Sequence, residues 1–123
     1  MPLVLVIDDD RLIRRVLEIN LRTDGFDVTM AASGAEALAA ADARRPDVVV
    51  LDLGLPDVDG AELIPALRGN DDASPLAIVV VSGADPDAGS GDRYASSVEA
   101  VLRKPVDPVV VVETVRRVLP RDA

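Results

Sequence analysis

The sequence predicts an α/β domain built on a doubly wound parallel sheet, with five strands and five helices. Short apolar runs alternate along the chain with segments of helical period, which is the pattern of strands joined by helical crossovers. Three of these runs, at 3–7, 48–51 and 76–81, contain only apolar residues. Strands of this kind are buried on both faces, so we expect them at the centre of the sheet.

The two remaining strands are weaker. Residues 26–30 alternate between apolar and polar side chains, and 100–102 is a short run, as expected of strands at the edges of a sheet. Short connections and right-handed crossovers then favour the strand order 2-1-3-4-5. This order defines a flavodoxin-like fold, in which ligands bind at the switch point between strands one and three.

The expected helices lie between and after these strands. Segments with helical character are found at 11–22, 33–45, 61–68, 85–98 and from 107 onward. Ser33 and Glu36 form a capping box, and Pro108 suits the first turn of the last helix. The valine run 109–112 locally favours a strand, but the order and length of the elements favour a helix. Pro65 should distort the third helix, because its ring removes a backbone donor.

Length and composition exclude several classes of function. The chain has 123 residues, no cysteine and no histidine, so we expect one domain without disulfides, thiolate chemistry or imidazole ligands. Its net charge of −9 opposes direct binding to nucleic acid or to an anionic membrane. We expect a cytoplasmic protein, because the N-terminus does not read as a signal peptide and no apolar run is long enough to cross a bilayer.

Polar residues follow four of the five expected strands. They are Asp8–Asp10, Asp52, Ser82–Gly83 and Lys104–Pro105. Since the carboxyl ends of parallel strands share one edge of the sheet, Asp8, Asp9 and Asp52 should converge there. Clustered carboxylates without histidine or cysteine favour a hard cation, Mg²⁺ or Mn²⁺. An acidic loop rim is the alternative explanation, and we expect Asp10 only to cap the following helix.

Lys104 is the only lysine among the 13 basic residues. Either Lys104 is an ordinary surface residue that occurs by chance, or it stands at a position where arginine could not perform the same role. A carboxylate beside a metal ion can act as a nucleophile and form an acyl phosphate. Lys104 would neutralise the transferring phosphoryl group, and the Ser82 hydroxyl and nearby backbone amides would donate to its oxygens. Ser82 has the simpler alternative of satisfying local backbone groups at a strand end.

With these motifs, the chain resembles the receiver domain of two-component response regulators over its whole length. The resemblance rests on Ile7-Asp8-Asp9, Leu51-Asp52-Leu53 with the following 55–60, Val81-Ser82-Gly83-Ala84 and Lys104-Pro105. The spacings of 43 residues from Asp9 to Asp52, 30 from Asp52 to Ser82 and 22 from Ser82 to Lys104 also match the family. We expect the domain to cover 1–120, with 121–123 as a tail or the start of a linker.

The resemblance implies a phosphoacceptor site. Asp52 would accept phosphate from a phosphohistidine on a histidine kinase or a histidine phosphotransfer protein. Asp9 and Asp52 would bind Mg²⁺ directly, together with the backbone carbonyl of Gly54, and Asp8 would act largely through water. The domain would be an acceptor that gains and loses phosphate, not a turnover enzyme.

The resemblance also assigns the residues around the phosphate. Lys104 would pair with the phosphoaspartate, which suits a compact ammonium better than a guanidinium. Ser82 and Gly83 would bind the phosphoryl oxygens, and Ser82 would move toward them on activation. Pro105 would follow a cis peptide bond that aims Lys104. An output domain or downstream protein would read the switch, and phosphorylation could also drive dimerisation.

Three other functions remain open from the sequence. A pseudo-receiver would use the same fold only for protein contacts, and Val101, which replaces the family's usual switching Tyr or Phe, leaves this alternative open. A Mg²⁺-dependent phosphohydrolase would normally have a second carboxylate two residues after its nucleophile, where this chain has Gly54. A flavodoxin-like cofactor carrier would need aromatic residues at the strand ends, and Phe26 and Tyr94 are not placed there.

Overall fold

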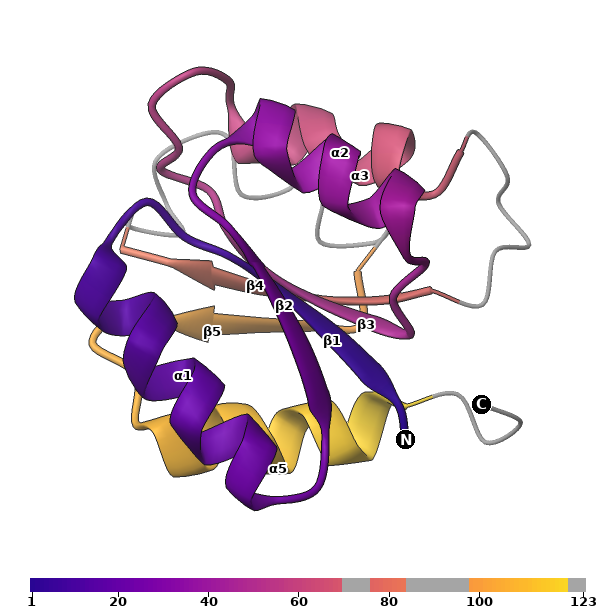
Figure 1. The fold of residues 1–123 in the computed structure, drawn as a ribbon. Coiled ribbons are helices and arrows are strands. Elements are labelled where there is room, and N and C mark those ends of the chain that lie inside the picture. The colour runs from indigo at the N-terminus through magenta and orange to yellow at the C-terminus, as the bar shows by residue number, and fades with distance from the viewer. Residues whose placement is uncertain (70–75, 84–97, 120–123) are drawn as a thin grey trace.

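The computed structural model describes residues 1–69, 76–83 and 98–119 and contains a parallel sheet of five strands (Figure 1). The strands are β1 (Leu3–Ile7), β2 (Asp27–Ala31), β3 (Val48–Asp52), β4 (Ala77–Ser82) and β5 (Ala100–Arg103). Their order is β2-β1-β3-β4-β5, and every neighbouring pair is parallel. The predicted fold class and strand order are therefore confirmed.

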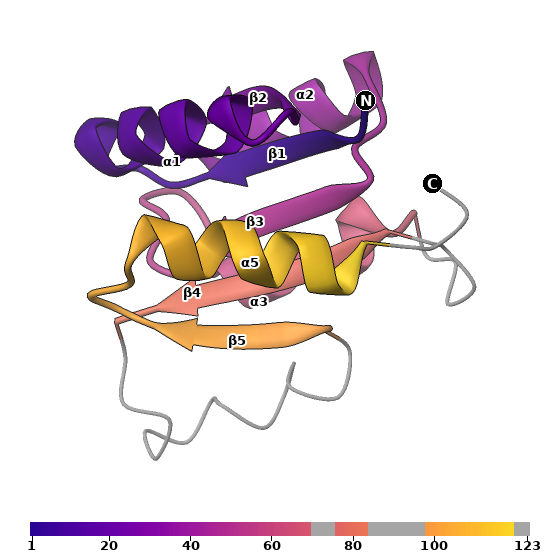
Figure 2. The same cartoon turned by 90° about the horizontal axis from the view of Figure 1, so that it is seen from below.

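Helices cover both faces of the sheet. The described helices are α1 (Arg11–Thr23), α2 (Gly34–Ala43), α3 (Gly60–Leu67) and α5 (Pro108–Val118). Figure 1 shows α2 and α3 over one face of the sheet and α1 and α5 over the other, and Figure 2 shows α1 and α5 together on the same face. The helix expected at 85–98 lies, except for Val98, outside the described residues.

The central strands are the most deeply buried parts of the chain. Every residue of β1, β3 and β4 is buried, whereas β2 has buried residues at only some positions and β5 alternates between half-buried and exposed residues. Successive side chains of a strand point to opposite faces, so Leu5 and Ile7 pack toward α2 and α3, while Val4 and Val6 pack toward α1 and α5. Continuous apolar runs are required because both faces of these strands are covered.

At the start of each described helix, the side chain of an N-cap residue accepts hydrogen bonds from backbone N–H groups. Asp10 accepts hydrogen bonds from the backbone of Leu12 and Ile13, so its predicted capping role is confirmed. Ser33 accepts from the Glu36 N–H at 3.2 Å, and Asp107 caps α5 one residue before Pro108. The valine run 109–112 lies within α5. Among the described helices, none is long and apolar enough to span a membrane.

The loop between β3 and α3 fits closely against the start of α2. The Asp57 carboxylate accepts hydrogen bonds from the backbone N–H groups of Gly34 at 2.9 Å and Ala35 at 3.1 Å. A Cβ atom on Gly34 would lie 2.5 Å from Cγ2 of Val58, so only glycine allows this approach. The hydrogen bonds from Gly34 and Ala35 lower the pKa of Asp57 below its usual value of 3.8. The loop that follows Asp52 is thereby fastened to α2.

We predict that Asp57→Asn lowers the free energy of unfolding at neutral pH, because the variant lacks the charge that the α2 N-terminus favours. A carboxyl group whose pKa is lower in the folded state stabilises the fold above its unfolded pKa and loses this effect as the pH falls through its folded pKa. The difference between parent and variant should therefore be constant above about pH 5 and shrink below pH 3.8. Urea denaturation across this range measures it.

The matched control is Asp42→Asn, which changes an exposed aspartate of α2, the helix that Asp57 contacts. Asp42 lies in the last turn of α2, where the helix dipole does not favour a carboxylate, so this variant should not lower the free energy of unfolding at neutral pH. A deficit of Asp57→Asn that stays the same on acidification would show that the carboxylate charge does not hold the loop.

Candidate functional site

The carboxyl ends of β1 and β3 bring three carboxylates together. Ile7 and Leu51 are paired in register, so Asp8 and Asp52 follow on adjacent strands. Asp8, Asp9 and Asp52 each offer an oxygen, and these oxygens lie within 4.8 Å of one another. Asp8 is only 3% exposed and Asp52 only 5%, whereas Asp9 is open to solvent. The convergence predicted from the strand ends is present in the structure.

Lys104 supplies the positive charge beside this cluster. Its Nζ lies 3.2 Å from Oδ2 of Asp52 and 3.4 Å from Oδ2 of Asp8. Partial burial opposes the charge on Lys104, but the two carboxylates outweigh it and raise the pKa of the ammonium above its usual 10.5. Lys104 is therefore charged at neutral pH and bridges the two buried carboxylates.

The same arrangement disfavours the charged form of the Asp8 carboxyl. Burial raises the pKa of the Asp8 carboxyl above its usual 3.8, and the neighbouring Asp52 charge also raises it. The backbone N–H of Asp10, which donates to Oδ1 of Asp8 at 2.9 Å, and the Lys104 ammonium counteract this shift. A further positive charge at this point would relieve the repulsion between the carboxylates.

The remaining predicted residues surround Asp52 and Lys104. The N–H of Gly54 donates to Oδ1 of Asp52 at 3.1 Å, which places Gly54 beside the carboxylate. Ser82 is buried at the end of β4, where its carbonyl accepts from the Lys104 N–H at 2.9 Å. Gly83 follows, and a Cβ there would lie 4.0 Å from the Lys104 side chain. The Lys104–Pro105 peptide bond is cis.

These groups have the chemistry of a hard-cation site. Carboxylate and carbonyl oxygens are the ligands that Mg²⁺ and Mn²⁺ prefer. The cluster presents oxygens of three carboxylates within 4.8 Å of one another, and the ammonium of Lys104 lies against two of them. The residues therefore fit a divalent cation, and the same arrangement can neutralise a phosphoryl group that is attached to Asp52.

Arg14 also belongs to this region, although no sequence motif singles it out from the helical segment 11–22. Its Nη1 donates to the backbone carbonyl of Asp8 at 2.7 Å. The available signal was its position: side chains of a helix lean toward its N-terminus, so an arginine in the second turn of α1 can reach the end of β1.

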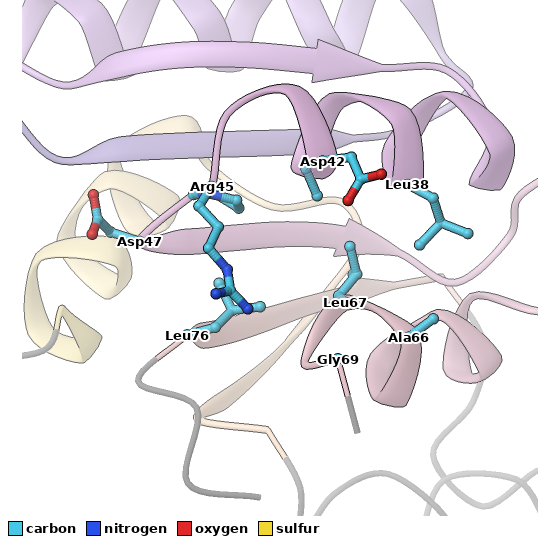
Figure 3. Close-up of a pocket in the computed structure, with 10 residues that line it drawn as sticks. Leu38, Asp42, Arg45, Asp47, Ala66, Leu67, Gly69 and Leu76 are labelled. Carbon is cyan, nitrogen blue, oxygen red and sulfur yellow. The ribbon is translucent and has the colours of Figure 1, made fainter. Parts of the chain in front are cut away.

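A separate cavity lies at the opposite edge of the sheet. It has a volume of about 810 Å³ and is lined by side chains that include Leu38, Arg45, Leu67 and Leu76. Figure 3 shows the Arg45 side chain extending toward Leu76, which precedes β4. Asp47, at the other end of β3 from Asp52, also borders this cavity. None of the predicted site residues lines it.

Comparisons with known proteins agree with this site. The sequence model of the family described as response regulator receiver domain matches residues 4–116. The transcriptional regulatory protein PrrA of Mycobacterium tuberculosis is 40% identical over 118 residues, which cover 95% of this chain and 48% of PrrA. KdpE of the same species is 55% identical over 69 residues, 56% of this chain and 30% of KdpE. The chain thus spans about half the length of relatives such as PrrA.

Solved structures give the same result. The chemotaxis protein CheY4 of Vibrio cholerae superimposes with a TM-score of 0.85 at 31% identity, covering 97% of this chain and 99% of that chain. The receiver domain of the Francisella response regulator 1452 gives a TM-score of 0.86 at 28% identity, with full coverage of both chains. The acidic cluster, its lysine partner and the match over residues 4–116 together show that this chain belongs to the receiver domain family of two-component response regulators.

Proposed function

We propose that Asp52 is the phosphoacceptor of this receiver domain. The observation that carries the proposal is the buried Asp52 carboxylate with Lys104 Nζ 3.2 Å away and two further carboxylates beside it. An Asp52 oxygen attacks the phosphorus of a phosphohistidine on a histidine kinase or phosphotransfer protein. The P–N bond breaks with its electron pair going to the imidazole nitrogen, and an acyl phosphate remains on Asp52.

The chain's own residues position and stabilise the phosphoryl group. Lys104 pairs with the new dianion, and the Ser82 hydroxyl and the backbone N–H of Gly83 donate to its oxygens. A Mg²⁺ or Mn²⁺ ion, when bound, neutralises charge on the phosphoryl oxygens. The groups that would hold it are the carboxylates of Asp8, Asp9 and Asp52 and the carbonyl of Gly54.

The proposed domain is a switch and not a turnover enzyme. Gly54 occupies the position two residues after Asp52, so no side chain there acts as a general acid or base in hydrolysis. Val101 on β5 is 45% exposed and has no aromatic ring to bury. We therefore infer that movement of Ser82 toward the phosphate transmits the signal through the adjoining backbone to an output domain or downstream protein.

The protein phosphodonor requires a surface beside Asp52. A groove of about 470 Å³ between α1 and the segment before α5 is lined by apolar residues and by Lys104. Leu12 at its rim is 71% exposed. Because Lys104 borders both the groove and the acidic cluster, a partner that lies over this groove can bring its phosphohistidine to Asp52. We propose that apolar side chains of the phosphodonor occupy the groove.

Phosphorylation of Asp52 is tested by intact-mass measurement. We predict that the parent chain gains the mass of one phosphoryl group when incubated with acetyl phosphate and Mg²⁺, and that chelation of the metal abolishes the gain. Asp52→Ala should gain nothing, whereas Asp42→Ala on the distant α2 should behave as the parent. Equal labelling of Asp52→Ala and parent would place the acceptor elsewhere.

Metal binding is tested without any phosphate. An ion that binds only the folded state stabilises it by mass action, by about 1.4 kcal/mol when its concentration is ten times its dissociation constant. We therefore predict that Mg²⁺ raises the melting temperature of the parent and that Asp52→Asn reduces this increase by removing one ligand. Asp42→Asn should retain the full increase. Identical melting of the parent in Mg²⁺ and in chelator would contradict a metal site.

The docking groove is tested by comparing two phosphodonors. We predict that Leu12→Arg slows transfer from a phosphorylated histidine kinase or phosphotransfer protein that is active on the parent by about tenfold or more, the effect of losing one well-packed apolar contact. Labelling by acetyl phosphate should not change. The control is Ile19→Arg, which alters a 51% exposed residue further along α1. An equal loss in both variants would argue against the groove.

A further inference from the structure

Arg14 forms a hydrogen bond to the backbone that carries the acidic pair. Its Nη1 donates to the Asp8 carbonyl at 2.7 Å, and this contact is partly buried. The carbonyl follows the last paired residue of β1, because the β1–β3 register ends at Ile7 and Leu51. On the other side of the residue, the Asp8 N–H donates to the Ala31 carbonyl of β2 at 3.1 Å. The Asp8 main chain is therefore held from two directions.

The Asp8 carbonyl belongs to the peptide unit that joins Asp8 to Asp9. This unit is planar, so fixing the direction of its carbonyl also fixes the plane from which the Asp9 backbone continues. The two carboxylates that flank this plane contribute to the three-carboxylate cluster. One hydrogen bond from Arg14 thus restrains the relative orientation of two candidate metal ligands.

The charge of Arg14 acts in the opposite direction to this restraint. A guanidinium close to the cluster repels an incoming cation, so its removal should strengthen metal binding if charge alone mattered. Loss of the hydrogen bond would instead let the Asp8–Asp9 peptide turn and weaken metal binding. The two effects of removing Arg14 therefore have opposite signs, and a single measurement separates them.

We propose that Arg14 is a positioning residue that holds the Asp8–Asp9 peptide in the orientation required for metal binding. The inference rests on the proposed function, because it assumes that this cluster binds a divalent cation. Groups that orient metal ligands from behind typically change metal affinity by about 10- to 100-fold, and Arg14 restrains two such ligands through their shared peptide.

The experiment compares Arg14→Met with Arg15→Met by calorimetric titration with Mg²⁺ alone. Both variants remove one positive charge from adjacent positions of α1, but Arg15 points to solvent with a 69% exposed side chain and pairs with Glu18. We expect Arg14→Met to raise the Mg²⁺ dissociation constant about tenfold, and Arg15→Met to leave it unchanged or slightly lower it. Arg14→Met affinity equal to or higher than that of the parent would overturn the proposal.

Two conservative variants distinguish loss of the Arg14 hydrogen bond from a general effect on folding. Arg14→Lys and Arg14→Gln each retain an N–H donor, so they should recover part of the affinity that Arg14→Met loses, whereas a purely electrostatic role predicts that both uncharged variants, Arg14→Met and Arg14→Gln, bind Mg²⁺ more tightly than the parent. If Arg14→Met does not fold, the same comparison is made with Arg14→Ala, which also lacks a side-chain donor, and affinity unchanged from the parent would then contradict the proposal. Absence of Mg²⁺ binding by the parent would instead reject the metal site of the proposed function.

Discussion

The bridge from Lys104 to Asp8 and Asp52 is the interaction on which the rest of this structure depends. Two carboxylates that are 3% and 5% exposed lose most of their contact with water, which is costly unless a partner compensates them. Lys104 compensates both at once, at 3.4 and 3.2 Å. The sheet order makes this possible, since β1 and β3 are neighbours and β5 ends on the same edge.

Much of this arrangement could be predicted from the sequence because it follows from apolar runs and the residues that end them. Uniformly apolar segments predicted the central strands, and the parallel topology then placed Asp8, Asp52 and Lys104 at one edge. The valine run 109–112 shows the limit of local preference: it is part of α5, where Val111 and Val115 pack into the core. Burial on the sheet outweighs the preference of valine for strands.

The contacts of Arg14 and Asp57 could not be predicted in the same way. Both side chains bind backbone groups, Arg14 the Asp8 carbonyl and Asp57 the N–H groups at the start of α2. Every residue has such groups, so the sequence contains no complementary side chain that would reveal the pairing. The contact of Asp57 also joins positions 22 and 23 residues apart, and it depends on how the β3–α3 loop packs against Gly34.

The electrostatic balance at the sheet edge would link metal binding to phosphoryl transfer in the proposed function. The region contains one ammonium and three carboxylates, so it retains excess negative charge and would repel the anionic phosphoryl group that Asp52 receives in the proposed function. A divalent cation would neutralise this excess charge and would also offset the burial and the Asp52 charge that raise the pKa of Asp8. The surplus of carboxylates over lysine is therefore the physical reason to expect that the proposed phosphorylation of Asp52 requires the cation in addition to Lys104.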